Sequence, residues 1–478
     1  MPAEIIGRNI ESKLLKQCYD SNKAELVAVY GRRRVGKTFL VKTLFDGKFD
    51  FYISGIYNGS RSEELQHFNE MLSQYSGIPY PVSDNWTDAF KQLKHYLGSL
   101  KKDRILVFID EMPWLDTPRS KFVKAFDLFW NEWASTCNNL CLIICGSATT
   151  WMNDNVISQK GGLHNRVTCK IKLSQFCLGE TEKMLESKKI KWNRMQIAEC
   201  WMILGGTPYY LDRLQRDMSL AQNIDFLFFR ENAEFRSEYD TILKSLFKQS
   251  GIYKRIIELL AKKGKGLTRQ EIVESLKLPE GGSLTSALEN LCNCDFIRSY
   301  TSFGKKERQT MYQLSDMFTL FYIKFVKNSG GKDDMFWLHS IDSPSRRAWS
   351  GYAFEKLCLN HIPQIKESLG IRGVLSNVCS WYQKGDPAKG SKGAQIDLLI
   401  ERRDQTINLC EAKYSSGPYT ITKKYFEEMS ERKEIFRVSS KTKYAILLTM
   451  ITAGGLVDNE YSSMIPNHIS LDDLFKIL

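Results

Sequence analysis

The chain has 478 residues, of which 43% are hydrophobic and 26% are charged, as is usual for a globular protein. A single hydrophobic core stops growing near roughly 250–300 residues, so the length predicts several domains. The sequence contains no run of about 18 apolar residues, and its start lacks a basic segment followed by an apolar one. We therefore expect no membrane span and no secretory signal, and we expect a cytoplasmic protein.

The net charge indicates a class of partner, and the spacing of the cysteines indicates their chemical state. The formal net charge is +12, which favours a polyanionic partner such as DNA, although many basic proteins bind no nucleic acid. None of the 12 cysteines belongs to a C-x-x-C pair, and several, among them Cys141, Cys145 and Cys410, lie inside apolar runs. We therefore expect buried, reduced thiols and no zinc site.

The first part of the chain alternates apolar runs with amphipathic stretches. The runs predict strands at residues 25–30, 49–54, 105–109, 140–145 and 167–173. Helical periodicity predicts helices at residues 60–74 and 86–100. Strands that alternate with helices are typical of a parallel sheet, so we expect an α/β domain at residues 1–175.

The remaining chain divides into four further segments. Strand patterns are absent from residues 178–248, which predicts a helical lid at 176–248. Three helices at 252–262, 270–276 and 284–292, followed by a hairpin of 296–301 and 310–314, predict a winged-helix domain at 249–328. Thr268 can cap the second helix, with Glu271 three residues on. Residues 329–344 contain SGGKDD and a Ser-Pro step and predict a linker, and an α/β domain follows at 345–478.

A phosphate-binding loop follows the first strand. The segment from Gly31 to Thr38 reads GRRRVGKT and fits G-x-x-x-x-G-K-[ST] between a strand and a helix. Its glycines let backbone N–H groups point at the phosphates of ATP, at a helix N-terminus where the dipole favours anions. Lys37 reaches the β- and γ-phosphates and the Thr38 hydroxyl ligates Mg²⁺. We expect these nucleotide contacts to come from Gly31, Arg34, Val35, Gly36, Lys37, Thr38 and Phe39.

The run ILVFIDE at residues 105–111 ends in two acids. Asp110 is placed to hold a water of the Mg²⁺, and Glu111 to polarise the attacking water. The alternative is a strand that ends in exposed carboxylates. Because nucleotide kinases lack a second acid that activates water, the pair favours an ATP hydrolase.

Two later residues are candidates for the same site. Ser147 follows the fourth apolar run and is placed to sense the γ-phosphate; the alternative is an ordinary strand-end cap. Arg166 in GGLHNR is a candidate for neutralising transition-state charge, from a neighbouring subunit if the chain forms a homo-oligomer. The alternative is a surface arginine.

Several segments carry a resemblance to a known group. IIGRNIE at residues 5–11 resembles the hhGRxxE box that precedes the phosphate loop in the signal-transducing (STAND) NTPases of the AAA+ branch. GRRRVGKT, IDEMPW, GSATTWM and GGTPYYL resemble the archaeal-type ATPase family, which is also found in bacteria. The resemblance covers about residues 1–325 and implies an ASCE/AAA+-like core. It also implies that Ile6, Gly7 and Arg8 contact adenine and ribose and that Pro208 contacts the base.

The last domain carries a second set of acids. Residues 394–400 and 407–413 predict two strands joined by a polar turn, and as a hairpin they make Asp397 and Glu411 cross-strand neighbours. Lys413 projects from the same face as Glu411. Two carboxylates and a lysine around Mg²⁺ suit phosphodiester hydrolysis. The set resembles the D…E-x-K core of restriction-endonuclease-like nucleases, in which Glu355 matches an upstream helix carboxylate. The alternatives are a nuclease-like fold that only binds, or plain ion pairs.

The predicted winged helix carries basic residues but an unusual recognition helix. That helix, residues 284–292, contains Glu289 and no arginine, so DNA contacts there should be mostly to phosphate. The alternative is a winged helix that serves only protein packing. The basic residues lie beside the first helix and on the wing: Lys262, Lys263, Lys265, Lys305, Lys306 and Arg308.

Two functions from different classes fit these features. The first is an ATP-driven DNA-processing protein whose C-terminal domain cuts or grips DNA. The second is a nucleotide-dependent regulatory switch that binds a protein or DNA and cuts nothing. The intact set of Asp397, Glu411 and Lys413 favours the first.

Overall fold

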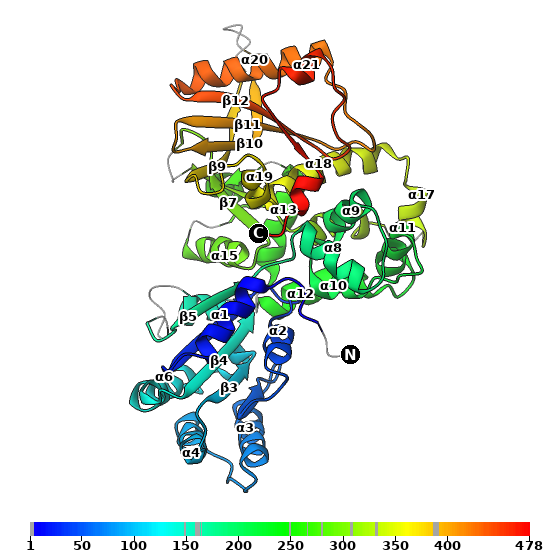
Figure 1. Ribbon diagram of the computed structural model, residues 1–478. Coiled ribbons are helices and arrows are strands. Elements are labelled where there is room, and N and C mark those ends of the chain that lie inside the picture. Colours follow the sequence, from blue (N-terminus) through cyan, green and yellow to red (C-terminus); the bar gives the residue numbers. More distant parts are fainter. Residues whose placement is uncertain are drawn as a thin grey trace. The chain divides into compact units, whose positions relative to one another are not determined.

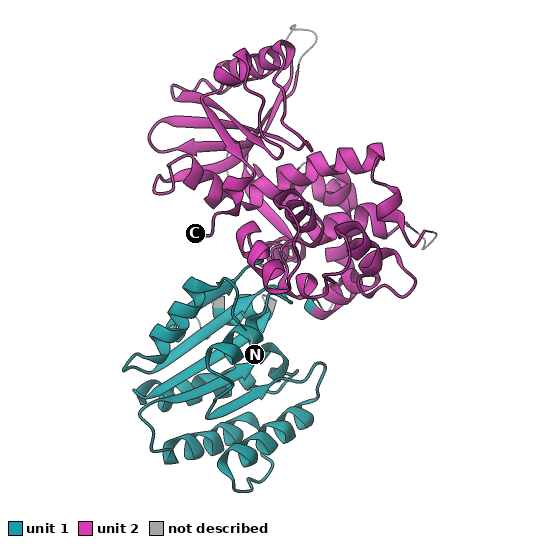
Figure 2. Ribbon diagram, turned by 45° about the vertical axis from the view of Figure 1, so that its right-hand side comes forward, with its two compact units in different colours: residues 1–175, 246–248 teal, residues 176–245, 249–478 magenta. Residues whose placement is uncertain are grey.

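The computed structural model describes residues 4–147, 150–157, 163, 165–247, 250–264, 266–278, 281–305, 309–329, 333–385 and 392–478. The chain forms two compact units (Figure 2). Unit 1 comprises residues 1–175 and 246–248, and unit 2 comprises residues 176–245 and 249–478. The finer division into a lid, a winged helix and a nuclease-like domain stays a prediction.

Unit 1 is built on a parallel sheet of five strands in the order β2-β3-β4-β1-β5, visible at the bottom of Figure 1. All five predicted strands are confirmed, as β1 Glu25–Gly31, β2 Phe51–Ser54, β3 Ile105–Asp110, β4 Leu140–Ser147 and β5 Cys169–Leu173. The two predicted helices are also confirmed, as α3 Arg61–Ser76 and α4 Trp86–Ser99. The other helices of this unit are α1 Asn9–Tyr19, α2 Lys37–Leu44, α5 Met112–Leu115, α6 Phe122–Glu132, η1 Ala134–Thr136, α7 Thr150–Met152 and η2 Asn153–Ile157.

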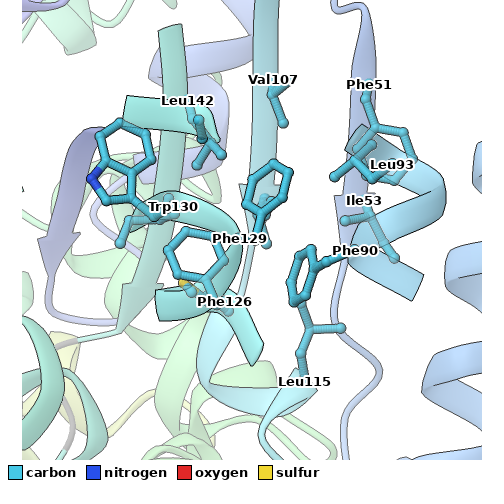
Figure 3. Packing of buried hydrophobic residues seen from close by; sticks show 14 of the residues in the cluster. Phe51, Ile53, Phe90, Leu93, Val107, Leu115, Phe126, Phe129, Trp130 and Leu142 are labelled. Atoms are coloured by element: carbon cyan, nitrogen blue, oxygen red, sulfur yellow. The ribbon is translucent and has the colours of Figure 1, made fainter. Parts of the chain in front are cut away.

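Both faces of this sheet are covered, which explains why its central strands read as continuous apolar runs. Every residue of β3 and β4 is buried. Successive side chains of β1 enter opposite cores, Leu26 with the cluster that contains α4 and α6, and Val27 with the cluster that contains α1 and α2. Figure 3 shows the first cluster, where Phe90, Phe126 and Phe129 pack against the strands. The sheet is thus a rigid base for the loops at its strand ends.

Residues 178–247 contain helices and no strand, as predicted. They are α8 Leu178–Ser187, α9 Arg194–Leu204, α10 Pro208–Asp212, α11 Leu220–Ile224, η3 Asp225–Phe229, η4 Glu234–Arg236 and α12 Glu238–Leu246. The three helices and the hairpin that follow are also present, as α13 Ser250–Lys263, α14 Arg269–Leu276, α15 Gly282–Asn293, β7 Ile297–Thr301 and β8 Thr310–Leu314. A short strand, β6 Leu267–Thr268, was not predicted and pairs with β8. Thr268 caps α14 in a capping box with Glu271, as predicted.

The predicted linker is partly helical. After α16 Met317–Phe321 and η6 Tyr322–Val326, the chain forms α17 Phe336–His339. Trp337 is fully buried, and its backbone N–H donates to Asp225 at 2.7 Å. The Arg346 guanidinium lies 4.0 Å from the centroid of the Trp337 ring. Tertiary contacts therefore order a segment whose local sequence is typical of a loop.

The C-terminal part has a mixed sheet in the order β13-β12-β11-β10-β9. The predicted hairpin is confirmed as β10 Ala394–Arg402 and β11 Thr406–Lys413, with Leu398 opposite Cys410. Asp397 directly precedes and Glu411 directly follows this pair, at the end of the described pairing of β10 with β11. The remaining elements are α18 Pro344–Asn360, α19 Ile362–Ser368, β9 Ser376–Gln383, α20 Lys423–Ser440, β12 Ala445–Thr452, α21 Glu460–Ser463, β13 Asn467–Ser470 and η8 Asp472–Phe475.

Candidate functional site

The phosphate loop connects the end of β1 to the start of α2. Gly31 has φ +152°, and a Cβ atom there would lie 2.2 Å from the carbonyl oxygen of Leu173 in β5, so only glycine fits. Gly36 has φ +88° and caps α2, and Arg34 also has a positive φ of 73°. The loop therefore turns sharply and presents the free N–H groups of the first turn of α2, which is the arrangement that binds phosphate.

Lys37 is the first residue of α2 and is only 5% exposed. Its ammonium group lies against the loop itself, 3.0 Å from the carbonyl oxygen of Arg32 and 3.4 Å from that of Gly31. Neutral carbonyls hold this cation in place without cancelling its charge. A phosphate group that enters the loop would therefore meet a buried positive charge, which also acts on the nearby Glu111 carboxylate.

The predicted Mg²⁺ ligands lie together. The Thr38 hydroxyl donates to Asp110 Oδ2 at 2.8 Å, although the two residues are 72 positions apart. Asp110 ends β3 and is 3% exposed, and its Oδ1 accepts from the Glu111 backbone N–H at 3.0 Å. A hydroxyl and a carboxylate oxygen are hard ligands, the kind that Mg²⁺ takes beside nucleotide phosphates. The residues present therefore fit this ion.

Glu111 follows Asp110 in a left-handed conformation, with φ 44°. Burial raises the pKa of its carboxyl group and nearby Asp110 adds to the rise, while Lys37 and Arg33 oppose it. The backbone N–H group of Ser147, at the end of the adjacent strand β4, also acts to lower the pKa of this carboxyl group. A carboxylate with a raised pKa is a better proton acceptor, which suits a group that polarises water. Ser147 therefore lies near Glu111, and its contact with a γ-phosphate stays a prediction.

The N-terminal box contacts the phosphate loop directly. Arg8 is 6% exposed, and its guanidinium donates to the carbonyl oxygens of Ser174 at 2.6 Å and Val35 at 3.3 Å. It also lies 3.5 Å from Glu11. These bonds tie the chain before α1 to the loop and to the end of β5. Arg8 therefore braces the loop, in addition to the nucleotide contact that the resemblance predicts for it and for Ile6 and Gly7.

The other predicted nucleotide contacts have different surroundings. Val35 is 1% exposed and packs in the core with α1 and α2, whereas Phe39 is 48% exposed on α2. Arg166 is 40% exposed and pairs with Asp127 of α6 at 3.4 Å. Pro208 is the first residue of α10 in unit 2, so its contact with a base stays a prediction.

The C-terminal hairpin forms a second charged site. Glu411 on β11 accepts hydrogen bonds from Tyr425 Oη at 2.6 Å and from Arg432 at 2.9 Å, and the Lys413 ammonium lies 2.9 Å from it. Burial opposes its charge, yet Lys413 and Arg432 outweigh burial and lower the pKa of Glu411. Sequence reasoning missed Tyr425 and Arg432. They stand seven residues apart on α20, on one face of the helix.

The helix acid and the strand acid belong to the same site. Burial raises the pKa of Glu355 on α18 to about 7, and the charges of Asp397 and Glu411 contribute to the rise. Asp397 is exposed and accepts a hydrogen bond from Gln395 at 2.6 Å. The structure thus brings Glu355, Asp397, Glu411 and Lys413 into one electrostatic neighbourhood. Within the described residues, however, no three His, Cys, Asp or Glu side chains are grouped so as to hold a metal ion.

The predicted DNA contacts are only partly described. Lys262 and Lys263 are exposed at the end of α13 and Lys305 is exposed near the end of β7. Lys265, Lys306 and Arg308 lie outside the described residues. The exposed side of α15 carries Ser283, Thr285, Ser286 and Glu289. Searched over the described chain, the helices include none long and apolar enough to cross a bilayer.

Comparisons with known proteins agree with the geometry of the first site. Residues 6–214 match the family model described as an ATPase domain predominantly from Archaea. This part of the chain is therefore an ATPase domain of the P-loop type.

Two curated proteins of Methanocaldococcus jannaschii are similar in sequence. The uncharacterized protein MJECL04 is 24% identical over 448 residues, which are 92% of this chain and 94% of that protein. The uncharacterized ATP-binding protein MJ0423 is 44% identical over 43 residues, which are 9% of this chain and 73% of that protein.

Two solved structures are similar in part. The Walker-type ATPase PABY2304 of Pyrococcus abyssi is 18% identical with a TM-score of 0.47, and the match covers 67% of this chain and 96% of that chain. The ORC2 protein of Aeropyrum pernix, solved in ADPNP–ADP complexes, is 14% identical with a TM-score of 0.43. That match covers 71% of this chain and 96% of the ORC2 chain.

Proposed function

We propose that the ATPase domain binds ATP with Mg²⁺ and hydrolyses it in the site at the ends of β1 and β3. The observation that carries the proposal is the hydrogen bond of 2.8 Å between Thr38 and Asp110, beside a buried Lys37 whose ammonium contacts backbone carbonyls. Thr38 and, through water, Asp110 would hold Mg²⁺, which supplies neutralisation of the β- and γ-phosphate charges.

The residues of this chain then have distinct tasks. Lys37 and the N–H groups of the first turn of α2 bind the β- and γ-phosphates. Glu111 orients the attacking water and polarises it by accepting a hydrogen bond from it. The raised pKa of Glu111 makes it a better base for this task. The backbone N–H group of Ser147 favours the charged form of Glu111.

The test is a comparison of ATP binding with ATP turnover. We expect Glu111→Gln to bind ATP as tightly as the wild type in isothermal titration, but to release phosphate about 10²–10⁴ times more slowly. Glu132→Gln, an exposed acid at the end of α6, is the matched control and should turn over normally. Normal phosphate release by Glu111→Gln would mean that another group activates the water.

We further propose that unit 2 acts on DNA, with Asp397, Glu411 and Lys413 forming a metal-dependent cleavage site next to Glu355. Three acids whose charges act on one another, with a lysine among them, support this proposal. Carboxylates that lie close together repel each other unless a cation is bound between them. Such a grouping of acids is typical of a metal site. Asp397 and Glu411 would hold the metal, which would supply Lewis-acid activation of the phosphodiester, and Lys413 would position the attacking water.

The rival function is a nucleotide-dependent switch that binds DNA or a protein and cuts nothing. It is favoured by the ion pairs of Glu411 with Lys413 and Arg432, which neutralise this acid without a metal. A cleavage assay with several DNA forms, with and without ATP and Mg²⁺ or Mn²⁺, separates the two. Under the nuclease proposal, Asp397→Ala stops cleavage and Glu428→Ala, an exposed acid of α20, does not. Wild type that binds DNA and leaves every form intact favours the switch.

A further inference from the structure

A cleft of about 580 Å³ lies in unit 2, and no residue of α15, β10 or β11 lines it. It is formed by the end of α13, the segment around η6 and the middle of α18. Its wall carries four lysines, Lys262, Lys263, Lys324 and Lys327, and one acid, Glu258. Lys327 pairs with Glu258 at 2.7 Å. The other three lysines have no carboxylate partner among the described residues, so the cleft is strongly positive.

An aromatic side chain joins this cleft to the C-terminal acids. Tyr352 of α18 lines the cleft and donates from its hydroxyl group to the carbonyl oxygen of Gly264, which lines it too. The Lys356 ammonium lies 4.8 Å from the centroid of the Tyr352 ring, and this lysine is only 5% exposed. Glu355 stands three residues after Tyr352, on the same side of the helix. One helical turn therefore separates the wall of the cleft from the carboxylate site.

The pattern of charge indicates what the cleft binds. Lys262 and Lys263 come from the last turn of α13, and Lys324 and Lys327 stand three residues apart in and after η6. The cations thus come from two separate elements of the wall, which suits contacts to more than one phosphate. The exposed side of α15, where a winged helix would read bases, carries Glu289 and no basic residue. The overall charge of +12 agrees with a polyanionic partner.

We infer that this lysine cleft holds the sugar-phosphate backbone of a nucleic acid and sets the strand beside Glu355 and the acids of the hairpin. The inference rests on the proposed function of unit 2 in acting on DNA. It assigns the main backbone contact to α13, η6 and α18, and not to the recognition helix. Contacts of this kind go to phosphate, so they fix the position of the strand without reading its sequence.

The test measures how DNA affinity depends on salt. Fluorescence anisotropy with labelled single-stranded and duplex DNA should be recorded over a range of NaCl concentrations for the wild type and for the triple variant Lys262→Ala, Lys263→Ala, Lys324→Ala. For every phosphate that the variant no longer neutralises, the slope of log affinity against log salt should fall by about 0.9 for duplex DNA and about 0.7 for a single strand. The double variant Lys183→Ala, Lys191→Ala, which removes two exposed lysines of the same unit, should keep the wild-type slope.

The outcomes separate the inference from the proposed function. If the wild type binds DNA and the triple variant has the same slope and the same melting temperature, the inference that the cleft binds the backbone is wrong. The proposal that unit 2 binds DNA then still stands. Wild type that binds neither DNA form at low salt overturns both. Inorganic tripolyphosphate is the remaining probe, used in a Lys37→Ala background so that the nucleotide site does not take it up. Binding of tripolyphosphate to the cleft without binding of DNA would make the ligand a small polyphosphate and also overturn the inference.

Discussion

The nucleotide site of unit 1 and the carboxylate site of unit 2 both combine acids with a lysine, but they balance these charges differently. In the first site, Lys37 contacts backbone carbonyls and Asp110 accepts from a hydroxyl and an N–H group. In the second, Glu411 is paired with both Lys413 and Arg432. In the first site, the cation Lys37 contacts neutral carbonyl oxygens and can attract an anionic ligand. In the second site, the acid Glu411 is already neutralised by two cations.

This difference teaches how the same residue types serve different ligands. A cation held by neutral groups attracts an anion, as a phosphate loop must. An acid already paired with two cations gains less from a metal, because the metal has to compete with or displace them. The two sites should therefore respond differently when single charges are removed.

The largest expected effect concerns Arg166, and it asks whether the first site is complete in one copy of the chain. If Arg166 neutralises transition-state charge in a neighbouring copy, Arg166→Ala should lower the ATPase rate by about 10³–10⁵, the range of arginine fingers. The wild-type rate per molecule should then rise with protein concentration. Both are read from phosphate release.

Asp127→Ala is the matched control, because Asp127 is the ion-pair partner of Arg166. It removes the same surface pair and leaves the arginine in place. Equal rates for the wild type and both variants would reduce Arg166 to a surface arginine.

The next prediction breaks the first site alone. Lys37→Ala should weaken ATP binding by about 2–5 kcal/mol, because the phosphate charges lose a buried cation. Binding of DNA to unit 2 without nucleotide should be unchanged. Isothermal titration measures the ATP affinity, and fluorescence anisotropy measures the DNA affinity. If Lys37→Ala binds ATP as tightly as the wild type, the assignment of the phosphate loop is wrong.

One pH effect on stability should arise from a buried histidine of unit 2. His361 is fully buried at the end of α18, where its Nε2 accepts from the Leu178 N–H at 3.0 Å and its Nδ1 lies 2.8 Å from the Leu357 carbonyl oxygen. Burial lowers the pKa of His361 to about 4. Between pH 6.5 and 4 the unfolded chain therefore binds a proton at His361 that the folded chain does not, so the contribution of His361 to stability falls as the pH falls, by about 3 kcal/mol. Glu355 on the same helix, with its pKa raised to about 7, acts in the opposite direction over this range.

Hydrogen exchange distinguishes this loss from a general acid effect. Between pH 6.5 and 4.5, peptides from α8 and α18 should lose more protection in the wild type than in His361→Gln, after correction for the intrinsic rate, and peptides from β1 should show no such difference. His361→Gln, which keeps an acceptor for the Leu178 N–H, should reduce the pH dependence. Equal loss in both units would show that His361 is not the cause.

The sequence predicts the first site better than the second for physical reasons. The five strands of unit 1 and the segment from Gly31 to Thr38 are local patterns, and the fold only has to bring Asp110 to Thr38. The hairpin of β10 and β11 is also local, and its register follows from the position of the turn. The partners Tyr425 and Arg432 come from α20, and no sequence pattern near Glu411 predicts their contacts with it. In the same way, α17 depends on the contact of Trp337 with Asp225, 112 residues earlier.

The smallest expected effect tests the second site directly through its response to metal. Binding stabilises a fold by RT ln(1 + [L]/Kd), which is about 2.7 kcal/mol at a hundredfold excess over Kd. Because Glu411 is already paired with Lys413 and Arg432, we expect the shift in the wild type to stay below this value. Melting curves of the full chain in the Lys37→Ala background, with and without Mg²⁺ or Mn²⁺, measure the shift without nucleotide in the first site. Asp397→Ala should abolish it and, in the absence of metal, should be no less stable than its parent, since the repulsion with Glu355 is relieved. Arg432→Ala should enlarge it, because one competitor for Glu411 is removed, whereas Glu428→Ala should leave it unchanged. If neither the wild-type hairpin site nor any of the three variants shows a metal-dependent shift in melting temperature, the ion pairs of Glu411 with Lys413 and Arg432 take the place of a metal. Unit 2 would then grip DNA and not cut it.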